Sequence, residues 1–439
     1  MAYALTGLKT PMGRRLTSAL SRVPTGFARY LDARKLLRGS ISKQSRLGLD
    51  WMNFFLADIQ TGFGAFVAFY LAELGWPKSQ VGLALSVGTI AGLVALIPGG
   101  ALVDWAPWKR GLAALGIAMI AAAAVILALV PSFVLVFAAE ILHGLAGGIM
   151  APAIAAISLG LVGRRAMSAR TGRNYGFDAA GNALTAGAMG LAGQYIAKSA
   201  IFLGAAALCI PALIALSCIR ADEIDDARAR NAGLGKRPAN FQRLFDLGKN
   251  TKLYVFAACI FLFQFADASM LPVISENLAQ NQNKPASVLV AGLIIAPQIV
   301  AALLSPWVGY HSERFGRKWL LLVGFVVEVV RALLFAVHSE YWVLIVGQLL
   351  SGISAATVTV LTVLVITDLT TGTGRFNLVQ GFVGTVIAIA ASISTGATGF
   401  IFEQVGHLSG FVILAGAATA ATGLLWTAMP ETKPGKYLD

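Results

Sequence analysis

Hydrophobic residues occur along the chain in twelve long runs, separated by short polar stretches. Each run has about the 20 residues that a helix needs to cross roughly 30 Å of hydrocarbon. Because lipid cannot satisfy free backbone groups, runs of this length predict helices. We therefore expect an all-α membrane protein with twelve transmembrane helices. The runs lie near residues 49–73, 80–103, 111–130, 132–161, 174–196, 199–219, 253–278, 286–308, 319–338, 342–367, 377–402 and 409–429.

The second half of the chain repeats polar features of the first half at an offset of 208 or 209 residues. Asp58 corresponds to Asp267, and Glu140 corresponds to Gln348. A duplicated membrane protein usually has its working site where the two copies meet. The repeat predicts two pseudo-symmetric six-helix bundles with polar groups between them.

The same pattern divides the chain into five parts. A mixed run of acids and bases interrupts the hydrophobic pattern in the middle, and we expect it to be a solvated linker. The predicted parts are a basic N-terminal tail over 1–48, a first bundle over 49–220, the linker over 221–252, a second bundle over 253–429 and a C-terminal tail over 430–439.

Composition agrees with a membrane protein, since 57% of the 439 residues are hydrophobic and only 13% are charged. The net charge of +13 does not indicate a nucleic-acid partner, because the basic residues are distributed by topology. If the N-terminus is cytoplasmic, only Lys78, Lys198 and Lys284 fall in outside loops. This bias predicts that both termini are cytoplasmic. We expect a multi-pass protein of a bacterial inner membrane, in contact with membrane lipids.

Several ionisable residues fall inside the hydrophobic runs, where charge is costly and is therefore a sign of function. Asp58 and Asp267 are expected near the middle of the bilayer. They would either bind substrate or protons, or fasten helices together by hydrogen bonds. Glu328 and Arg331 are three residues apart with opposite charges, and we expect them to pair within the second bundle.

Glu140 and His143 are also three residues apart, so they share a helix face. Histidine titrates nearest to neutral pH, which makes this pair a candidate proton carrier. A satisfied structural histidine is the alternative. The second half has Gln348 and Ser351 at the corresponding positions, which can form hydrogen bonds but do not titrate.

A short motif follows the second hydrophobic run of each half. Gly309-x-x-x-Glu313-Arg314-Phe315-Gly316-Arg317-Lys318 is the fuller copy, whereas the first copy keeps Gly100, Asp104, Lys109 and Arg110. With the twelve runs and the duplication, this motif makes residues 49–429 resemble the major facilitator superfamily. The family pattern is approximately Gly-x-x-x-Asp-Arg-x-Gly-Arg-Arg/Lys, and the first copy departs from it at Trp105 and Trp108.

The resemblance implies a central cavity between the bundles and a gate at the cytoplasmic end. The acid of each motif could contact a helix N-terminus or an arginine across the interface and hold that end closed. We expect Glu140 and His143 to couple transport to protons. The expected cavity residues are Asp58, Gln264, Asp267, Gln348 and Ser351, and the expected gate residues are Gly100, Asp104, Lys109, Arg110, Gly309, Glu313, Arg314, Gly316, Arg317 and Lys318.

The sequence thus predicts a monomeric, proton-coupled secondary transporter for a small organic molecule, working by alternating access. We expect it to be an efflux antiporter; a proton-driven uptake symporter and a non-transporting receptor or assembly protein are the alternatives. No nucleotide-binding, catalytic or metal-ligand motif is present in the sequence, so we expect neither an enzyme nor a bound cofactor.

Overall fold

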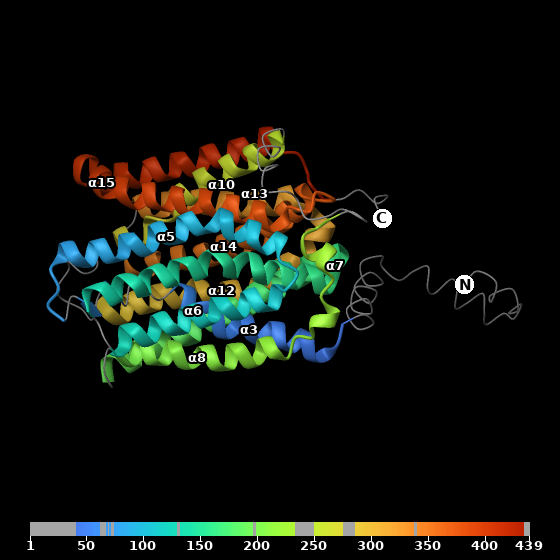
Figure 1. Cartoon of the computed structure of the whole chain (residues 1–439). Helices are drawn as coiled ribbons and strands as arrows, with labels where there is room; N and C mark the ends of the chain where they lie inside the picture. Colours follow the sequence, from blue (N-terminus) through green and yellow to red (C-terminus); the bar gives the residue numbers. More distant parts are fainter. Residues whose placement is uncertain are drawn as a thin grey trace, which may run out of the picture.

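A computed structural model describes residues 41–61, 67–68, 70–71, 74–129, 132–195, 199–232, 250–274, 286–337 and 340–433 of the chain. These residues form a bundle of long helices that run roughly parallel or antiparallel to one another (Figure 1). The long helices are α3 (Lys43–Thr61), α5 (Lys78–Trp105), α6 (Lys109–Leu129), α7 (Phe133–Tyr195), α8 (Ser199–Ser217), α10 (Thr251–Asp267), α12 (Ala286–Phe315), α13 (Arg317–Val337), α14 (Tyr341–Leu369) and α15 (Phe376–Ala428).

Among the described residues, ten helical segments are long and apolar enough to cross a membrane. One of them, Phe133–Ala188, has 56 residues and covers two of the predicted crossings. Together with α3, these segments correspond to all twelve predicted runs. The all-α membrane fold predicted from hydropathy is confirmed.

Two helices, α7 and α15, each cover two of the predicted crossings, because only one non-helical glycine separates the two parts of each helix. The backbone of α7 leaves helical geometry at Gly163 (φ 66°), and that of α15 does so at Gly406 (φ 79°). Glycine adopts positive φ without the steric cost that a Cβ imposes. Residues 164–173 were expected to lie in a loop between two crossings, and this expectation is wrong: they form the first turns of the second part of α7.

The helices form two groups, one from each half of the chain, and pack mainly within their own group. In the first half, α3, α5 and α6 pack against α7, and α8 packs against α3 and α6. In the second half, α10 and α13 pack against α15, and α14 packs against α12 and α13. The main contacts between the halves are α5 with α15 and α7 with α12. We call the end where α5 finishes and α6 begins the motif end; the turn from α12 to α13 belongs to it as well.

The described part of the predicted solvated linker, residues 221–232, agrees with the prediction at its exposed start and differs from it near its end. It contains a short 3-10 turn, Ala221–Glu223, and the helix α9, Asp226–Ala229. Ala229, Arg230 and Asn231 are buried at the motif end. The expectation of a solvated segment is wrong for these three residues only, since Ala221, Asp222, Asp225 and Arg228 are exposed. Residues 233–249 and most of the predicted tails lie outside the described residues, and the five boundaries stay predictions.

Candidate functional site

The motif of the first half joins the two halves at the motif end. The carboxylate of Asp104 accepts hydrogen bonds from the backbone N–H groups of Asn377 (3.2 Å) and Leu378 (2.8 Å) and from the Asn377 side-chain amide (2.8 Å). Asn377 and Leu378 lie in the first turn of α15. Asp104 is only 6% exposed. A buried anion thus meets the free N–H groups and the positive end of a helix from the opposite half.

Close backbone approach supports this contact. A Cβ added at Gly100 would lie 2.9 Å from the carbonyl carbon of Asn377, and one added at Gly381 would lie 2.9 Å from that of Leu96. Contacts this short leave no room for a side chain. Glycine at these positions therefore lets α5 and α15 touch along the turns next to Asp104.

The basic residues of the first motif do not reach the second half. The Lys109 ammonium lies 3.0 Å from Asp226 and donates a hydrogen bond to the Ala106 carbonyl (2.6 Å). Arg110 donates to the Ser217 carbonyl at 3.4 Å. Lys109 therefore fastens the α5–α6 turn to α9, and Arg110 fastens it to the end of α8.

The second motif makes a corresponding contact in the opposite direction. Glu313 on α12 accepts a hydrogen bond from the Ser168 hydroxyl, which lies on the second part of α7. A Cβ added at Gly309 would lie 2.8 Å from the Cα of Gly172 on the same segment. Unlike Asp104, the Glu313 side chain is 47% exposed. The two motifs thus each contact the other half, with the first more deeply buried.

The remaining residues of the second motif stabilise the α12–α13 turn from within the second half. Arg317 is 2.7 Å from Glu313 and 3.1 Å from Asp368, at the end of α14. The Lys318 ammonium donates to the Trp426 carbonyl at 2.7 Å. Of the other two motif residues, Gly316 occupies the turn at φ 91° and Arg314 lies over the ring of its neighbour Phe315, 5.4 Å from the ring centroid.

The described part of the linker adds a third set of contacts at the motif end. The side-chain amide of Asn231 donates to the Thr367 carbonyl (2.6 Å) and the Thr370 hydroxyl (3.1 Å) at the end of α14. The Ala229 carbonyl accepts from the Asn377 amide at 3.1 Å. This segment therefore bridges the last turn of α14 and the first turn of α15.

Asp267, expected in the cavity, forms an ion pair. Its carboxylate lies 2.5 Å from the Arg331 guanidinium on α13 and is 32% exposed. Arg331 also contacts Glu328 at 2.9 Å, so the predicted pairing of these two residues is confirmed. Arg331 and Glu328 are nearly fully buried. One guanidinium thus joins two carboxylates, and the partly exposed Asp267 is the accessible member.

The other predicted cavity residues are in different environments. Gln264 and Ser351 are half-buried, whereas Gln348 is 1% exposed and its amide nitrogen has no hydrogen-bond partner among the described residues. Asp58 lies on α3, but its side chain is outside the described residues. These residues stay predictions as a substrate site.

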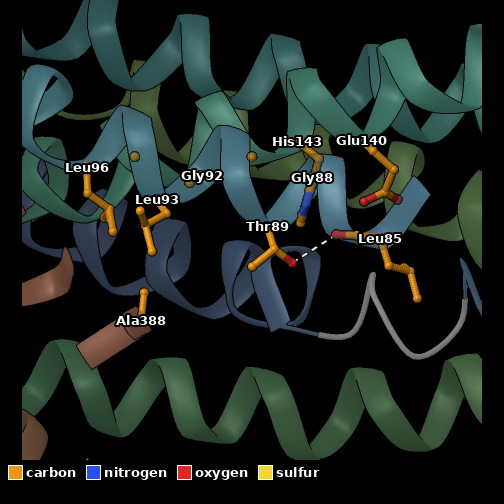
Figure 2. Close-up of a pocket in the computed structure, with 12 residues that line it drawn as sticks. Leu85, Gly88, Thr89, Gly92, Leu93, Leu96, Glu140, His143 and Ala388 are labelled. Carbon is orange, nitrogen blue, oxygen red and sulfur yellow. Dashed lines mark hydrogen bonds between the residues drawn. The ribbon is translucent and has the colours of Figure 1, made fainter. Parts of the chain in front are cut away.

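A pocket of about 520 Å³ lies where α5, α7 and α15 meet. Glu140 and His143 extend from α7 toward α5, and Ala388 comes from α15 (Figure 2). Glu140 is 4% exposed, and its Oε1 atom has no hydrogen-bond partner among the described residues. It packs over Gly88, where an added Cβ would lie 3.2 Å from the Glu140 Cβ. The two predicted coupling residues thus line one pocket between the halves.

Leu96 separates this pocket from the motif end. It lines the pocket, and one of its methyl groups would lie 3.3 Å from a Cβ added at Gly384 of α15. Asp104 lies eight residues farther along α5, which corresponds to about 12 Å of helix. On the same pair of helices, the structure is closed at the motif end and hollow beyond Leu96.

The sequence model of the Major Facilitator Superfamily matches residues 50–296 and 253–438, so it covers nearly all of the helical chain. The chain belongs to the major facilitator superfamily. This agrees with the two-bundle arrangement and identifies the protein as a multi-pass integral membrane transporter.

Relatives within the superfamily cover the chain to different extents. The MFS-type transporter Rv2456c of Mycobacterium tuberculosis is 35% identical over 387 residues, 88% of this chain and 93% of that protein. Multidrug resistance protein 1 of Bacillus subtilis is 27% identical over 42% of this chain and 47% of its own length. The class B tetracycline resistance protein of Escherichia coli is 41% identical over 59 residues, 13% of this chain and 15% of that protein.

Among solved structures, the human organic anion transporter MFSD10 (TETRAN) matches 90% of this chain and 99% of its own chain. The TM-score is 0.63 and the sequence identity is 18%. At this identity the similarity establishes a shared superfamily fold, and it carries no information about the substrate.

Sequence reasoning missed the partners of the superfamily motif. Asn377 and Ser168 contact the two motif acids, and Asn231 bridges the helix ends beside them. A partial signal for Asn377 was present, because Thr373-Gly374-Arg375 comes just before α15, although its earlier copy, Thr171-Gly172-Arg173, lies within α7. Asn231 carried no such signal, since its segment has the composition of a solvated loop.

Proposed function

We propose that this protein is a proton-coupled secondary active transporter that exports a small organic molecule by alternating access. The proposal depends on one combination: a closed motif end and, on the same helices, a pocket containing a buried acid whose Oε1 is unpartnered among the described residues. A site that is closed on one side and hollow on the other is what alternating access requires.

Asp104 and Glu313 would hold the motif end closed in this scheme. Both acids contact the opposite half, so these contacts must break before the halves can separate there. The bias of basic residues favours a cytoplasmic location for this end. The described conformation would then be closed to the cytoplasm, and the inward-open state would be the one that lacks these bonds.

Glu140 and His143 would bind and release the coupling proton. An ionised carboxylate buried without a full set of partners is costly, so a proton or a ligand must compensate its charge. Both residues line the pocket, where substrate binding and proton binding would affect one another. The protein would act as a monomer, since each half supplies a motif acid to the other within one chain.

Export is favoured over uptake by the names of the partial relatives, which confer resistance to tetracycline and to several drugs. Uptake by symport with protons is the second candidate. The direction of coupling distinguishes the two, because an antiporter accumulates substrate on the acidic side of the membrane and a symporter on the opposite side.

Purified protein in proteoliposomes with an acidic interior tests the proposal. A panel of organic molecules that includes tetracycline is added outside, and uptake is measured with and without the pH gradient. We expect gradient-dependent accumulation inside, which Glu140→Gln abolishes and Glu340→Gln, at the exposed start of α14, preserves. Accumulation only with an acidic exterior would establish symport. Equal gradient dependence in Glu140→Gln would refute the coupling scheme.

A further inference from the structure

The pocket at Glu140 combines a single acid with an apolar lining. Its apolar side chains are Leu85, Leu93 and Leu96 of α5 and Ala388 of α15. Its volume of about 520 Å³ falls within the range of pockets for small organic ligands, roughly 300–1,000 Å³. Such a lining can pack against the apolar part of a compact organic molecule.

The charged groups that line the pocket indicate the sign of the charge on its ligand. The Glu140 side chain is only 4% exposed, and its Oε1 atom has no hydrogen-bond partner among the described residues. His143 is the other titratable group in the lining, and no lysine or arginine belongs to the described lining residues. A cation would supply the missing partner of the carboxylate, whereas an anion would add a like charge in a desolvated site.

We propose that this pocket binds amphipathic organic cations, with Glu140 as the counter-charge and the three leucines around the apolar body. The inference deepens the proposed function by naming the substrate class of its site. Figure 2 shows the arrangement: Glu140 lies at one part of the pocket, and Leu93, Leu96 and Ala388 lie together at another.

Gly147 offers a way to fill the pocket without disturbing the protein. It is a lining residue of α7, and a Cβ added there would meet no atom within 4 Å. Gly204 on α8 is equally unobstructed and does not line the pocket. Gly147→Leu should therefore occupy the ligand space, and Gly204→Leu is its matched control.

Tetraphenylphosphonium and tetraphenylborate test the proposal directly, because they have nearly the same shape and opposite charge. Each is titrated calorimetrically into the full-length protein in nanodiscs, with empty nanodiscs subtracted. We expect the phosphonium ion to bind at least tenfold more tightly than the borate. Glu140→Gln and Gly147→Leu should each raise its Kd at least tenfold, and Gly204→Leu should change the Kd less than twofold.

Glu140→Asp guards against a variant that fails to fold, because it keeps the charge and should keep the preference for the cation. Tighter binding of the borate, or an unchanged Kd for the phosphonium ion in Glu140→Gln and Gly147→Leu, would overturn the proposal. So would the absence of phosphonium binding to the wild-type protein. Binding as expected together with no pH-driven transport would contradict the proposed function alone, since the titration requires no transport.

Discussion

The contact between Asp104 and the start of α15 gives the most specific prediction about the closed motif end. Asp104→Asn keeps the shape of the side chain but removes its charge and one of its acceptor oxygens. The native carboxylate accepts three hydrogen bonds from Asn377 and Leu378 while buried. The amide would retain one carbonyl acceptor and would direct N–H groups at other N–H groups.

The magnitude follows from these bonds. A hydrogen bond to a charged group contributes about 1.5–3 kcal/mol, and loss of the anion at a helix start costs up to about 2 kcal/mol more. Allowing for a remaining bond, we expect the closed state to lose about 3 kcal/mol relative to the open state. At about 1.4 kcal/mol per factor of ten, this shifts the equilibrium roughly 150-fold toward opening at the motif end.

Spin labels at Trp108 and Thr371 can measure this shift. Both side chains are exposed at the motif end, one in each half. Pulsed electron–electron distance measurements in nanodiscs, with the three native cysteines replaced by alanine, should show a longer distance becoming prominent in Asp104→Asn. Asp222→Asn, whose side chain is 68% exposed, should leave the distribution unchanged. A wild-type distribution in Asp104→Asn would refute the assignment of Asp104 as a latch.

Three further predictions concern contacts around this end and in the second bundle. Glu313→Gln should shift the same distance distribution less than Asp104→Asn does, because the Glu313 carboxylate is 47% exposed and solvent can replace its bonds. Asn231→Ala removes two buried hydrogen bonds and should shift the equilibrium between the closed and open states about tenfold toward the open state. An unchanged distance distribution in this variant would show that the linker is not part of the closed contact. Arg331→Met should destabilise the protein by about 3–5 kcal/mol, because it leaves two acids without their partner, and thermal unfolding in detergent should show partial recovery when Glu328→Gln is added. An unchanged melting temperature in Arg331→Met would contradict the structural role of this network.

The sequence predicted those features that depend on local pattern. Hydropathy alone identifies the membrane spans, because each helix must satisfy its own backbone in lipid. The pairing of Glu328 with Arg331 follows from their spacing on one helix face, and the structure shows it at 2.9 Å. The additional bond from Arg331 to Asp267 joins residues on different helices, and spacing within one helix contains no information about it.

Contacts between the halves were less accessible to sequence reasoning for the same physical reason. Asp104 and Asn377 are 273 residues apart, and their contact depends on how α5 packs against α15. The motif in the second half is the fuller copy of the family pattern, yet Glu313 is the more exposed of the two acids. Agreement with a motif indicates that a turn and a contact exist; burial, which determines their strength, depends on the tertiary packing.

The pocket and the closed end are connected through a single helix. One face of α5 between Leu85 and Leu96 lines the pocket, Leu96 packs against α15, and Asp104 binds the start of that same helix. If α5 moves as a rigid unit, a separation of α5 from α15 at Asp104 must pivot about the close contact at Leu96. The pivot would bring the Leu85 end of α5 toward the second half and narrow the pocket. This geometry gives a physical reason why the site would open to one side only when it closes to the other.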